Sequence, residues 1–315
     1  MLWQAEEVKA NIPELNMEGQ KHVLAPEVVA YNQYYGLDFE ARIIGLEHTV
    51  GKFKAAGFDV VAHVYRFQKA AGTVYIHHGY YDHVGIYNHI IEHCLQQGYN
   101  VFIYDLPGHG LSSGERAGIT SFSQYDDVFE CGLKLIQKYL PQPLVVMGQS
   151  TGGAVIINYL LSRGITKQTS PFKQIYLMAP LVRPTSWVSG QFFYYLVRPF
   201  TGKVKRVFAK NSGNAAFLKF ISQQDPLQPL ALRTSWVGAL KKWIKSIEAT
   251  EPVNLEVQVI QGTDDGTVDY QHNMKILTEK FIGLKIKYVV AGGHQLVNEE
   301  PIKRAQVFAV MTPLL

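Results

Sequence analysis

A serine between two glycines lies near the middle of the chain. The apolar residues 144–147 are typical of a strand buried on both faces, and a Gly-Gln-Ser-Thr-Gly motif follows at 148–152. The apolar run at 154–161 then predicts a buried helix. Gly-x-Ser-x-Gly between a strand and a helix is typical of a nucleophile elbow, a tight turn that holds the serine Oγ out at the top of a sheet. The motif predicts a nucleophile at Ser150; the alternative is a glycine-rich turn without chemistry.

Two later loops offer the partners that such a serine needs. A serine hydroxyl is a poor nucleophile at neutral pH, so it requires a general base and a carboxylate that orients the base. In this architecture the partners follow in the order serine, acid, histidine. One later loop contains Asp264 and Asp265, and the next contains His294, the last histidine of the chain. The spacing from Gly262 favours Asp265 over Asp264, and the alternative for His294 is a surface histidine that caps a helix.

The predicted chemistry also requires two backbone N–H groups that bind an oxyanion. One is expected from the residue after the nucleophile, Thr151, at the start of a helix. The other is expected from the loop after an early strand, where Tyr80 follows His78 and Gly79. His78 is then expected to fix this loop rather than act as a base. Asp105, which precedes the serine, is expected to bind backbone N–H groups of its own loop.

The elements that must position these loops alternate along the chain. An antiparallel hairpin is expected at 47–67. Strands are then predicted at 73–77, 100–105, 144–147, 174–179, 256–261 and 285–290, and helices at 84–97, 125–139, 154–161, 270–281 and 301–311. Alternation of this kind predicts an α/β fold with a mostly parallel central sheet covered by helices on both faces. All the marked loops follow strands, so they meet at the carboxyl edge of the sheet, where ligands bind.

The alternation lapses once, which suggests three parts. Residues 1–44 are predicted to be an N-terminal extension packed on the core. Residues 45–180 and 246–315 form the predicted α/β core, and residues 181–245 an inserted helical cap. The cap sequence is rich in aromatic residues, including Trp187 and Phe192. We expect these two to line an apolar acyl slot and, with Gln149 and Tyr81, to contact the substrate; the alternative is that the aromatics only pack the cap on the sheet.

The aromatic stretch is followed by basic residues. Six aromatics fall between Trp187 and Phe200, and the cations after them are Lys203, Lys205, Arg206 and Lys210. Apolar side chains beside cations predict peripheral, salt-sensitive contact with an anionic membrane. The alternative is an ordinary solvated face.

Composition limits the function classes. The chain of 315 residues has 47% hydrophobic and 18% charged residues and a net charge of +4. These are globular values, and the charge is too small to indicate a nucleic-acid partner.

Cys94 and Cys131 are expected to be unpaired small hydrophobes, which fits a reducing compartment. The start shows no secretory signal, no apolar run reaches a membrane span, and no His/Asp cluster has metal-ligand spacing. We expect a cytoplasmic protein, or one peripheral to the inner membrane face, without metal or cofactor.

Five stretches carry a resemblance to a known family. They are residues 78–83 with Tyr87, residues 105–116, residues 148–153, Asp265 with 268–269, and His294 with 298–299. In order and spacing the chain from about 47 to 311 resembles the monoglyceride lipase and lysophospholipase group of α/β-hydrolases, also described as serine aminopeptidase S33-like. It departs from that group in Gln149, where a histidine is usual, and in the bulky Tyr80 and Tyr81. The N-terminal 44 residues have no counterpart in the compact lipases.

The resemblance implies the substrate class. We expect a serine hydrolase that cleaves carboxylic esters of single-acyl-chain lipids, of lysophospholipase or monoacylglycerol lipase type, through an acyl-enzyme on Ser150. One alternative is a short-chain carboxylesterase or thioesterase with the same triad. Another is a non-catalytic binding protein with the hydrolase fold. A peptidase of the proline iminopeptidase type is disfavoured, because no acidic cap feature for an amino terminus stands out.

Overall fold

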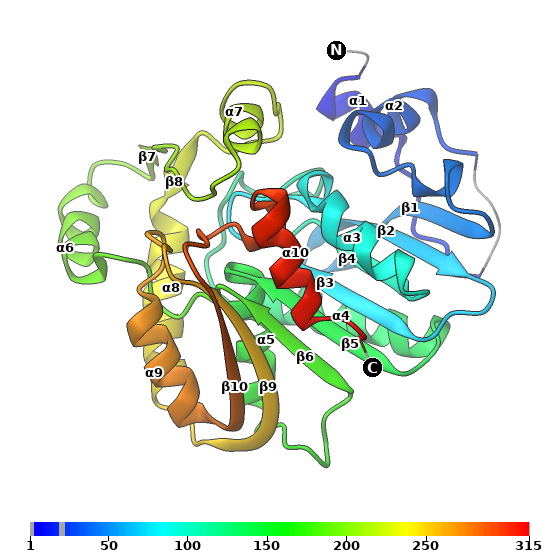
Figure 1. The fold of residues 1–315 in the computed structure, drawn as a ribbon. Coiled ribbons are helices and arrows are strands. Elements are labelled where there is room, and N and C mark those ends of the chain that lie inside the picture. The colour runs from blue at the N-terminus through cyan, green and yellow to red at the C-terminus, as the bar shows by residue number, and fades with distance from the viewer. Residues whose placement is uncertain (1–2, 19–22, 315) are drawn as a thin grey trace.

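The protein, described by a computed structural model for residues 3–18 and 23–314, contains one large sheet with helices on both sides (Figure 1). The eight strands lie in the order β1-β2-β4-β3-β5-β6-β9-β10. They are β1 (Leu46–Ala55), β2 (Phe58–Phe67), β3 (Thr73–His77), β4 (Asn100–Tyr104), β5 (Leu144–Gln149), β6 (Gln174–Met178), β9 (Val253–Gly262) and β10 (Phe281–Val289). Pairing is antiparallel at β1–β2 and β2–β4 and parallel elsewhere in this sheet. The predicted fold class is confirmed.

Ten α-helices, three 3-10 turns and a small second sheet make up the other regular elements of the described residues. The helices are α1 (Ala5–Asn11), α2 (Pro26–Tyr35), α3 (Asn88–Gln96), α4 (Ser123–Tyr139), α5 (Thr151–Ser162), α6 (Trp187–Val197), α7 (Ala215–Gln223), α8 (Thr234–Glu248), α9 (Tyr270–Lys280) and α10 (Pro301–Val310). The strands β7 (Lys203–Lys205) and β8 (Ala231–Arg233) form a short antiparallel pair. Across the described ranges, no helix combines the length and the apolar character needed to cross a bilayer.

The central strands are buried because both of their faces are covered. Every residue of β3, β4 and β5 is buried, and these strands are rich in Val, Ile and aromatic side chains, as parallel strands between helices require. One apolar cluster joins the sheet to α4, α5, α8 and α9, and a second joins it to α1, α2, α3 and α10. The central strands therefore hold the loops at their carboxyl ends on a rigid support.

Several predicted boundaries differ from the structure by up to four residues, and two of these differences have a clear cause. The last strand begins at Phe281, four residues earlier than expected, because Phe281 and Ile282 pair with Val253 and Asn254 at the start of β9. The helix expected at 84–97 starts as the 3-10 turn η2 (Val84–Tyr87) before α3. Neither difference moves a loop that carries a predicted site residue.

The segment after β6 leaves the sheet and returns at the neighbouring strand β9 (Figure 1). Its elements α6, β7, α7 and β8 lie beyond the carboxyl edge, and α8 leads back to the core. The predicted cap boundary at 245 falls inside α8, whose Trp243 stacks on Phe122 with ring centroids 4.7 Å apart. The division into extension, core and cap stays a prediction.

Candidate active site

The elbow around Ser150 has the sharp geometry that its sequence predicts. Ser150 lies between β5 and α5 with φ 53° and ψ −113°, a backbone conformation that is strained for a residue with a side chain. A Cβ on Gly148 would lie 2.5 Å from the carbonyl carbon of Gly152, and a Cβ on Gly152 would lie 2.2 Å from the oxygen of His77. Glycine is therefore required on both sides of the turn.

The structure brings Ser150, His294 and Asp265 together in a chain of contacts. His294 Nε2 lies 2.9 Å from Ser150 Oγ, and His294 Nδ1 lies 2.8 Å from Asp265 Oδ2. All three residues are buried. An imidazole that donates Nδ1–H to the carboxylate leaves Nε2 free to accept the serine proton. The arrangement has the geometry of a nucleophile, a base and an orienting acid.

Asp265 is held by more than the imidazole. Its Oδ1 accepts from the backbone N–H groups of Thr267 (2.9 Å) and Val268 (3.1 Å), and its Oδ2 accepts from the Gln261 side chain (3.1 Å). Burial alone would raise the pKa of Asp265, but the nearby His294 and these N–H groups outweigh it and lower that pKa. Asp265 therefore stays ionised beside the base.

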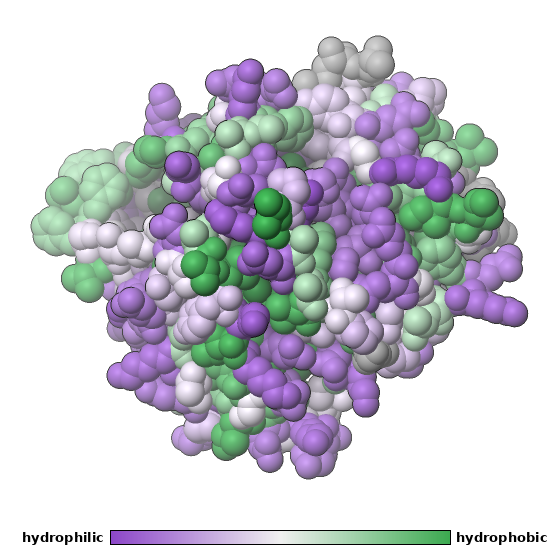
Figure 2. All heavy atoms as spheres, viewed as in Figure 1, coloured by the Kyte–Doolittle hydropathy of each residue, from purple (hydrophilic) through white to green (hydrophobic). Residues whose placement is uncertain are grey.

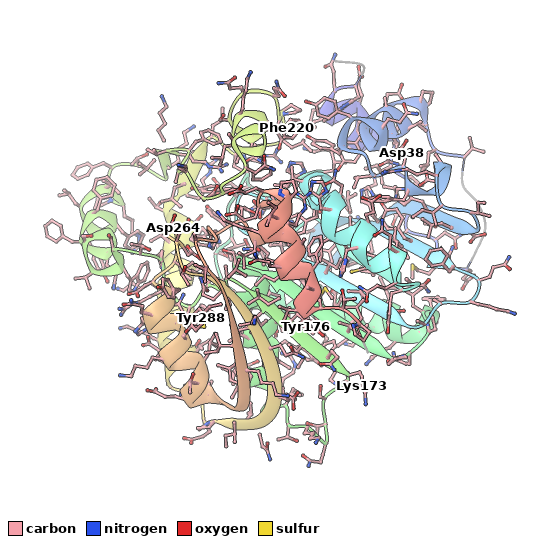
Figure 3. The ribbon with its side chains drawn as sticks, viewed as in Figure 1. Asp38, Lys173, Tyr176, Phe220, Asp264 and Tyr288 are labelled. Carbon is pink, nitrogen blue, oxygen red and sulfur yellow. The ribbon has the colours of Figure 1, made fainter. Side chains whose placement is uncertain are left out.

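The neighbouring acid Asp264 has a different environment. Its side chain is exposed, while its backbone N–H donates to the carbonyl of Gly292 at 2.9 Å. Figure 3 labels it on the loop beyond β9. Of the two adjacent acids, only Asp265 contacts His294.

Two backbone N–H groups near Ser150 have the properties of oxyanion donors. Within the described ranges, neither Tyr80 N nor Thr151 N donates a hydrogen bond to another residue, and both residues line the same cavity as Ser150. The adjacent Gly79 N–H is already used, since it donates to Tyr87 Oη (2.9 Å) and Asp82 Oδ2 (3.2 Å). These contacts set the shape of the turn and leave Tyr80 N available.

His78 and Asp105 fix loops, as the sequence predicts. His78 Nε2 accepts from the backbone N–H of Leu106 at 2.8 Å, so its Nδ1 donates to the carbonyl of Gly79 at 2.8 Å. Burial lowers the pKa of His78 well below its usual value, which keeps the ring neutral. Asp105 accepts from the N–H groups of Val84 and Leu111, both at 2.7 Å.

The Gln149 side chain lies under the histidine loop instead of in the cavity wall. It is fully buried, and its Nε2 donates to the carbonyl of His294 at 2.7 Å. Gln295, the residue after the histidine, donates to Asp82 Oδ1 at 2.8 Å, and Glu299 accepts from the Gly293 N–H at 2.7 Å. Three contacts from different elements therefore fix the position of His294.

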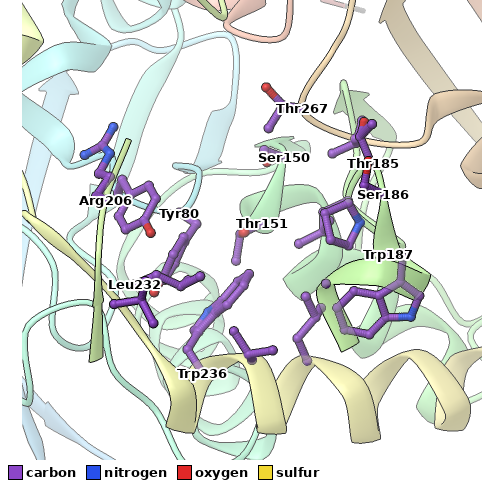
Figure 4. A pocket seen from close by; sticks show the side chains of 18 of the residues that line it. Tyr80, Ser150, Thr151, Thr185, Ser186, Trp187, Arg206, Leu232, Trp236 and Thr267 are labelled. Carbon is purple, nitrogen blue, oxygen red and sulfur yellow. The ribbon is translucent and has the colours of Figure 1, made fainter. Parts of the chain in front are cut away.

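A cavity of about 340 Å³ opens onto Ser150 and His294. Figure 4 shows Trp187 and Arg206 on opposite sides of Ser150, with Trp236 of α8 below. Further apolar side chains of its wall are Leu181, Tyr194, Val197, Val204, Leu232, Val237 and Leu240. The predicted substrate residues Tyr81 and Trp187 line this cavity. The structure does not bring Phe192 to it: that side chain is 74% exposed, and its neighbour Phe193 lines the wall.

Arg206 has a place that the sequence did not predict. Its guanidinium lies 4.0 Å from the ring centre of Tyr81 and 4.3 Å from that of Phe208, and Nη1 donates to Gln228 Oε1 at 2.7 Å. Burial lowers the pKa of Arg206. The side chain lines the active-site cavity, so it does not belong to a basic surface formed with Lys203 and Lys205.

A buried ion pair near the site also escaped the sequence analysis. Asp225, after α7, lies 2.8 Å from His83 Nε2, and its other oxygen accepts from Tyr35 Oη of α2 at 2.6 Å. Burial opposes both charges, yet their attraction raises the pKa of His83 and lowers that of Asp225. One carboxylate thus joins α2, the loop after β3 and the segment after α7. The sequence does contain one feature that could have pointed to Asp225, since it is the only acid in residues 181–247.

Comparisons with known proteins identify similar sequences and folds. The family model described as "Serine aminopeptidase, S33" matches residues 68–301. A monoacylglycerol lipase of Mycolicibacterium smegmatis is 32% identical over 89 residues, which cover 28% of this chain and 32% of the relative. A monoglyceride lipase of Rattus norvegicus is 28% identical over 122 residues, covering 37% of this chain and 39% of the relative. The chain thus matches a third to two fifths of the length of these relatives.

Solved structures agree on the fold. A crystal structure of a soluble variant of monoglyceride lipase from Saccharomyces cerevisiae, in complex with a substrate analog, superimposes with a TM-score of 0.70. The match covers 86% of this chain and 94% of the yeast chain, at 19% sequence identity. At this identity the likeness concerns the fold alone.

Proposed function

Because the chain belongs to the serine aminopeptidase S33 family, in the monoglyceride lipase-type group of α/β-hydrolases, we propose that this ester hydrolase cleaves lipids with a single acyl chain through an acyl-enzyme on Ser150. The observation that carries the proposal is the contact chain Ser150–His294–Asp265, at 2.9 and 2.8 Å, beside a mainly apolar cavity. An apolar cavity with a few convergent polar groups suits an acyl ester.

Acylation begins at the serine hydroxyl. Ser150 Oγ forms a bond to the ester carbonyl carbon while its proton passes to His294 Nε2, and the carbonyl electron pair moves onto oxygen. The N–H groups of Tyr80 and Thr151 stabilise that oxyanion. When the intermediate collapses, the carbon–oxygen bond to the alcohol breaks, and His294 gives its proton to the leaving oxygen. Asp265 stabilises the imidazolium throughout and holds the ring in orientation.

Deacylation repeats these steps with water. His294 takes a proton from a water molecule whose oxygen attacks the acyl carbon, and the second intermediate releases the fatty acid. Ser150 Oγ leaves with the proton from His294, which restores the starting state. The contacts of Gln149, Gln295 and Glu299 with the histidine loop keep His294 in place for both halves of the reaction.

The charges in the cavity favour an ester over a peptide with a free amino terminus. An aminopeptidase must pair the substrate ammonium with a carboxylate. Among the described residues that line the cavity, the acid is Asp82. Its oxygens already accept from Gly79, Tyr87 and Gln295, and burial raises its pKa. We therefore expect no turnover of aminoacyl anilides.

A substrate panel tests the proposal. Monoacylglycerol, lysophospholipid and a ladder of simple esters and thioesters from short to long chains are compared by kcat/KM. The proposal expects kcat/KM to rise with chain length and to remain measurable for at least one single-chain lipid. A preference for the shortest chains would favour the esterase or thioesterase alternative. Failure of Ser150 to react with a fluorophosphonate would support a non-catalytic binding protein.

We also propose peripheral contact with an anionic membrane through α6 and the residues after it. Support comes from the exposure of apolar side chains on this helix, including Val188 at 79%, and of Phe200 after it at 86%. Lys203 and Lys205 are exposed as well, whereas Arg206 faces the cavity and would not contribute. Sedimentation with anionic vesicles should show binding that weakens as salt screens the charges.

A further inference from the structure

Positive charge is concentrated in one part of the molecule. Residues 181–245 contain eleven Lys and Arg side chains and a single acid, Asp225. The rest of the chain contains nineteen Lys and Arg against twenty-five Asp and Glu. Because Asp225 is buried against His83, it does not offset the cations at the surface. The net charge of the whole chain is therefore small, although residues 181–245 are strongly basic and the rest of the chain is acidic.

Four of these cations line a groove between α6 and α8. The groove has a volume of about 480 Å³ and is separate from the space above Ser150. Arg198 follows the end of α6, and the other cations are Lys241, Lys242 and Lys245 of α8. On α8 the positions 238, 241, 242 and 245 share one face, while Trp236, Leu240 and Trp243 are buried. No acid is among the described residues that line the groove.

These four cations lack the carboxylate partners that other cations have. Within the described ranges, Arg198 and the three lysines form no ion pair, whereas Arg183 and Arg233 of the same segment bind Asp269 and Glu115. Lys241 Nζ instead lies 4.3 Å from the ring centre of Tyr195. Like charges gathered in one groove repel each other, so an anion that enters it gains from all of them.

The groove borders the most apolar exposed surface of the segment. Helix α6 has Val188, Phe192, Phe193, Tyr195 and Leu196 more than half exposed, and Phe200 follows it. Figure 2 shows hydrophobic residues at the end of the molecule where α6 lies in Figure 1. A free phosphate would need no apolar border. An ion whose charge sits at the surface of a hydrocarbon layer would use both the cations and the apolar helix.

We propose that the α6–α8 groove binds the phosphate group of an anionic phospholipid in a membrane, with α6 lying in the membrane interface. The occupant is a lipid of the surrounding membrane and is not the molecule cleaved at Ser150. The site therefore goes beyond the proposed ester hydrolysis and does not require Ser150 to act.

The groove is adjacent to the active site through two shared residues, Tyr194 and Thr234. Tyr194 lines both the groove and the active-site cavity, and it packs against α8, since a Cβ on Gly238 would lie 2.7 Å from Tyr194 Oη. A headgroup in the groove would contact α6 and α8 together and hold this wall of the cavity. The bound lipid is therefore expected to lower the KM for a substrate presented in the same membrane.

The test compares two triple variants that remove equal charge from the same segment. One is Lys241→Gln/Lys242→Gln/Lys245→Gln in the groove. The matched control is Lys203→Gln/Lys205→Gln/Lys210→Gln, which lies outside the groove. Both are prepared with Ser150→Ala and sedimented with phosphatidylcholine vesicles that contain or lack phosphatidic acid. The groove variant should bind the phosphatidic acid vesicles about tenfold more weakly than the control, since each cation in contact contributes more than a distant one.

Further measurements distinguish lipid binding from the binding of a free anion, and from a folding defect of the variant. Leu196→Ser/Phe200→Ser should weaken vesicle binding as well, and inorganic phosphate should not displace the vesicles at low millimolar concentration. With Ser150 restored, the groove variant should hydrolyse a water-soluble short-chain ester like the unmodified protein. Equal losses for the two triple variants would reduce the groove to diffuse attraction and overturn the proposal. Displacement by inorganic phosphate would also overturn it, by assigning the groove to a free ion.

Discussion

Asp265 and Lys241 are both charged side chains beside a cavity, yet their surroundings differ. Asp265 is buried and receives hydrogen bonds from a histidine, two backbone N–H groups and a glutamine. Lys241 lies over an aromatic ring in a groove without acids among its described lining residues. The charge of Asp265 is compensated by groups of the protein, whereas the charge of Lys241 has no carboxylate partner among the described residues of the groove. The contacts of Asp265 fix its position, and Lys241 is available to bind an anion from outside the protein.

The same difference extends to the ion pairs and the apolar residues. Outside residues 181–245, even an exposed arginine such as Arg163 binds two acids at once, at 2.9 Å each. Of the sixteen large hydrophobic residues that are exposed among the described ones, eight belong to residues 181–245, about a fifth of the chain. A surface with unpaired cations and exposed apolar side chains is typical of an interaction site. Substitutions in the two regions should therefore affect different measurements.

The largest effect should follow a change at the nucleophile. Ser150→Ala is expected to lower kcat on a soluble ester by several orders of magnitude, because the three residues of a triad act as a unit. Stability should change little, and thermal unfolding followed by circular dichroism is the control. Labelling by a fluorophosphonate at another serine would contradict the assignment of Ser150.

The adjacent acids provide the second test. Asp265→Asn should lower kcat about 10⁴-fold, because the amide no longer holds the imidazole in the required tautomer. Asp264→Asn is the matched control on the next residue and should cost far less, since that side chain is exposed. If the two variants exchanged effects, Asp264 would be the residue that orients His294 in solution.

The third test concerns stability. Asp225→Asn leaves His83 without its buried counter-ion and should lower the free energy of unfolding by about 3 kcal/mol. Glu256→Gln removes the exposed partner of Lys285 and should cost less than about 1 kcal/mol. Chemical denaturation of both variants measures the difference. A loss for Asp225→Asn no larger than that for Glu256→Gln would mean that the ion pair does not join the three parts.

The pH dependence of that third effect has a definite sign. The lowered pKa of Asp225 contributes stability above about pH 4, which is lost as pH falls toward the folded value. The raised pKa of His83 contributes stability below about pH 6.5, which is lost as pH rises through the folded value. The advantage of the unmodified protein over Asp225→Asn should therefore be largest between these limits and shrink on either side.

The smallest effect should distinguish two neighbouring aromatics. Phe193 lines the cavity and Phe192 points away from it. Phe193→Ala should raise the KM for a long-chain ester about tenfold, as expected when apolar contact with a substrate is lost. Phe192→Ala should leave the KM for a water-soluble ester unchanged and weaken vesicle binding. Equal effects of the two substitutions on the KM for the soluble ester would show that α6 rotates about its axis in solution, so that both side chains reach the cavity.

The sequence predicted the parts that depend on chain order and missed the parts that depend on side-chain direction. Strand alternation places the Ser150, Asp265 and His294 loops at one sheet edge before any coordinates are known. It does not show that Gln149 turns beneath the histidine loop, because the carbonyl that Gln149 reaches belongs to His294, 145 residues later in the chain. The predicted choice of Phe192 over Phe193 also concerns side-chain direction, which the sequence does not show because α6 is apolar on every side.

The sequence analysis also missed contacts between residues that are far apart in the chain. Asp225 is 142 residues from His83 and 190 from Tyr35, and no local pattern predicts such a meeting. The basic groove likewise needs both α6 and α8 in place, because Arg198 and Lys241 become neighbours only when the two helices pack. The predicted basic cluster followed sequence proximity and therefore included Arg206, which lines the cavity.

The uneven charge also gives the molecule a direction. Residues 181–245 are basic and the rest of the chain is acidic, so the molecule has an electric dipole that would turn in the field of an anionic surface before any contact is made. At physiological ionic strength that field extends about 8 Å, so the rotation happens within the last water layers of the approach. Such a surface would repel the acidic part of the molecule and attract residues 181–245. Encounters would then begin with α6 facing the surface, and the rate of productive collisions would exceed that of a uniformly charged molecule of the same net charge.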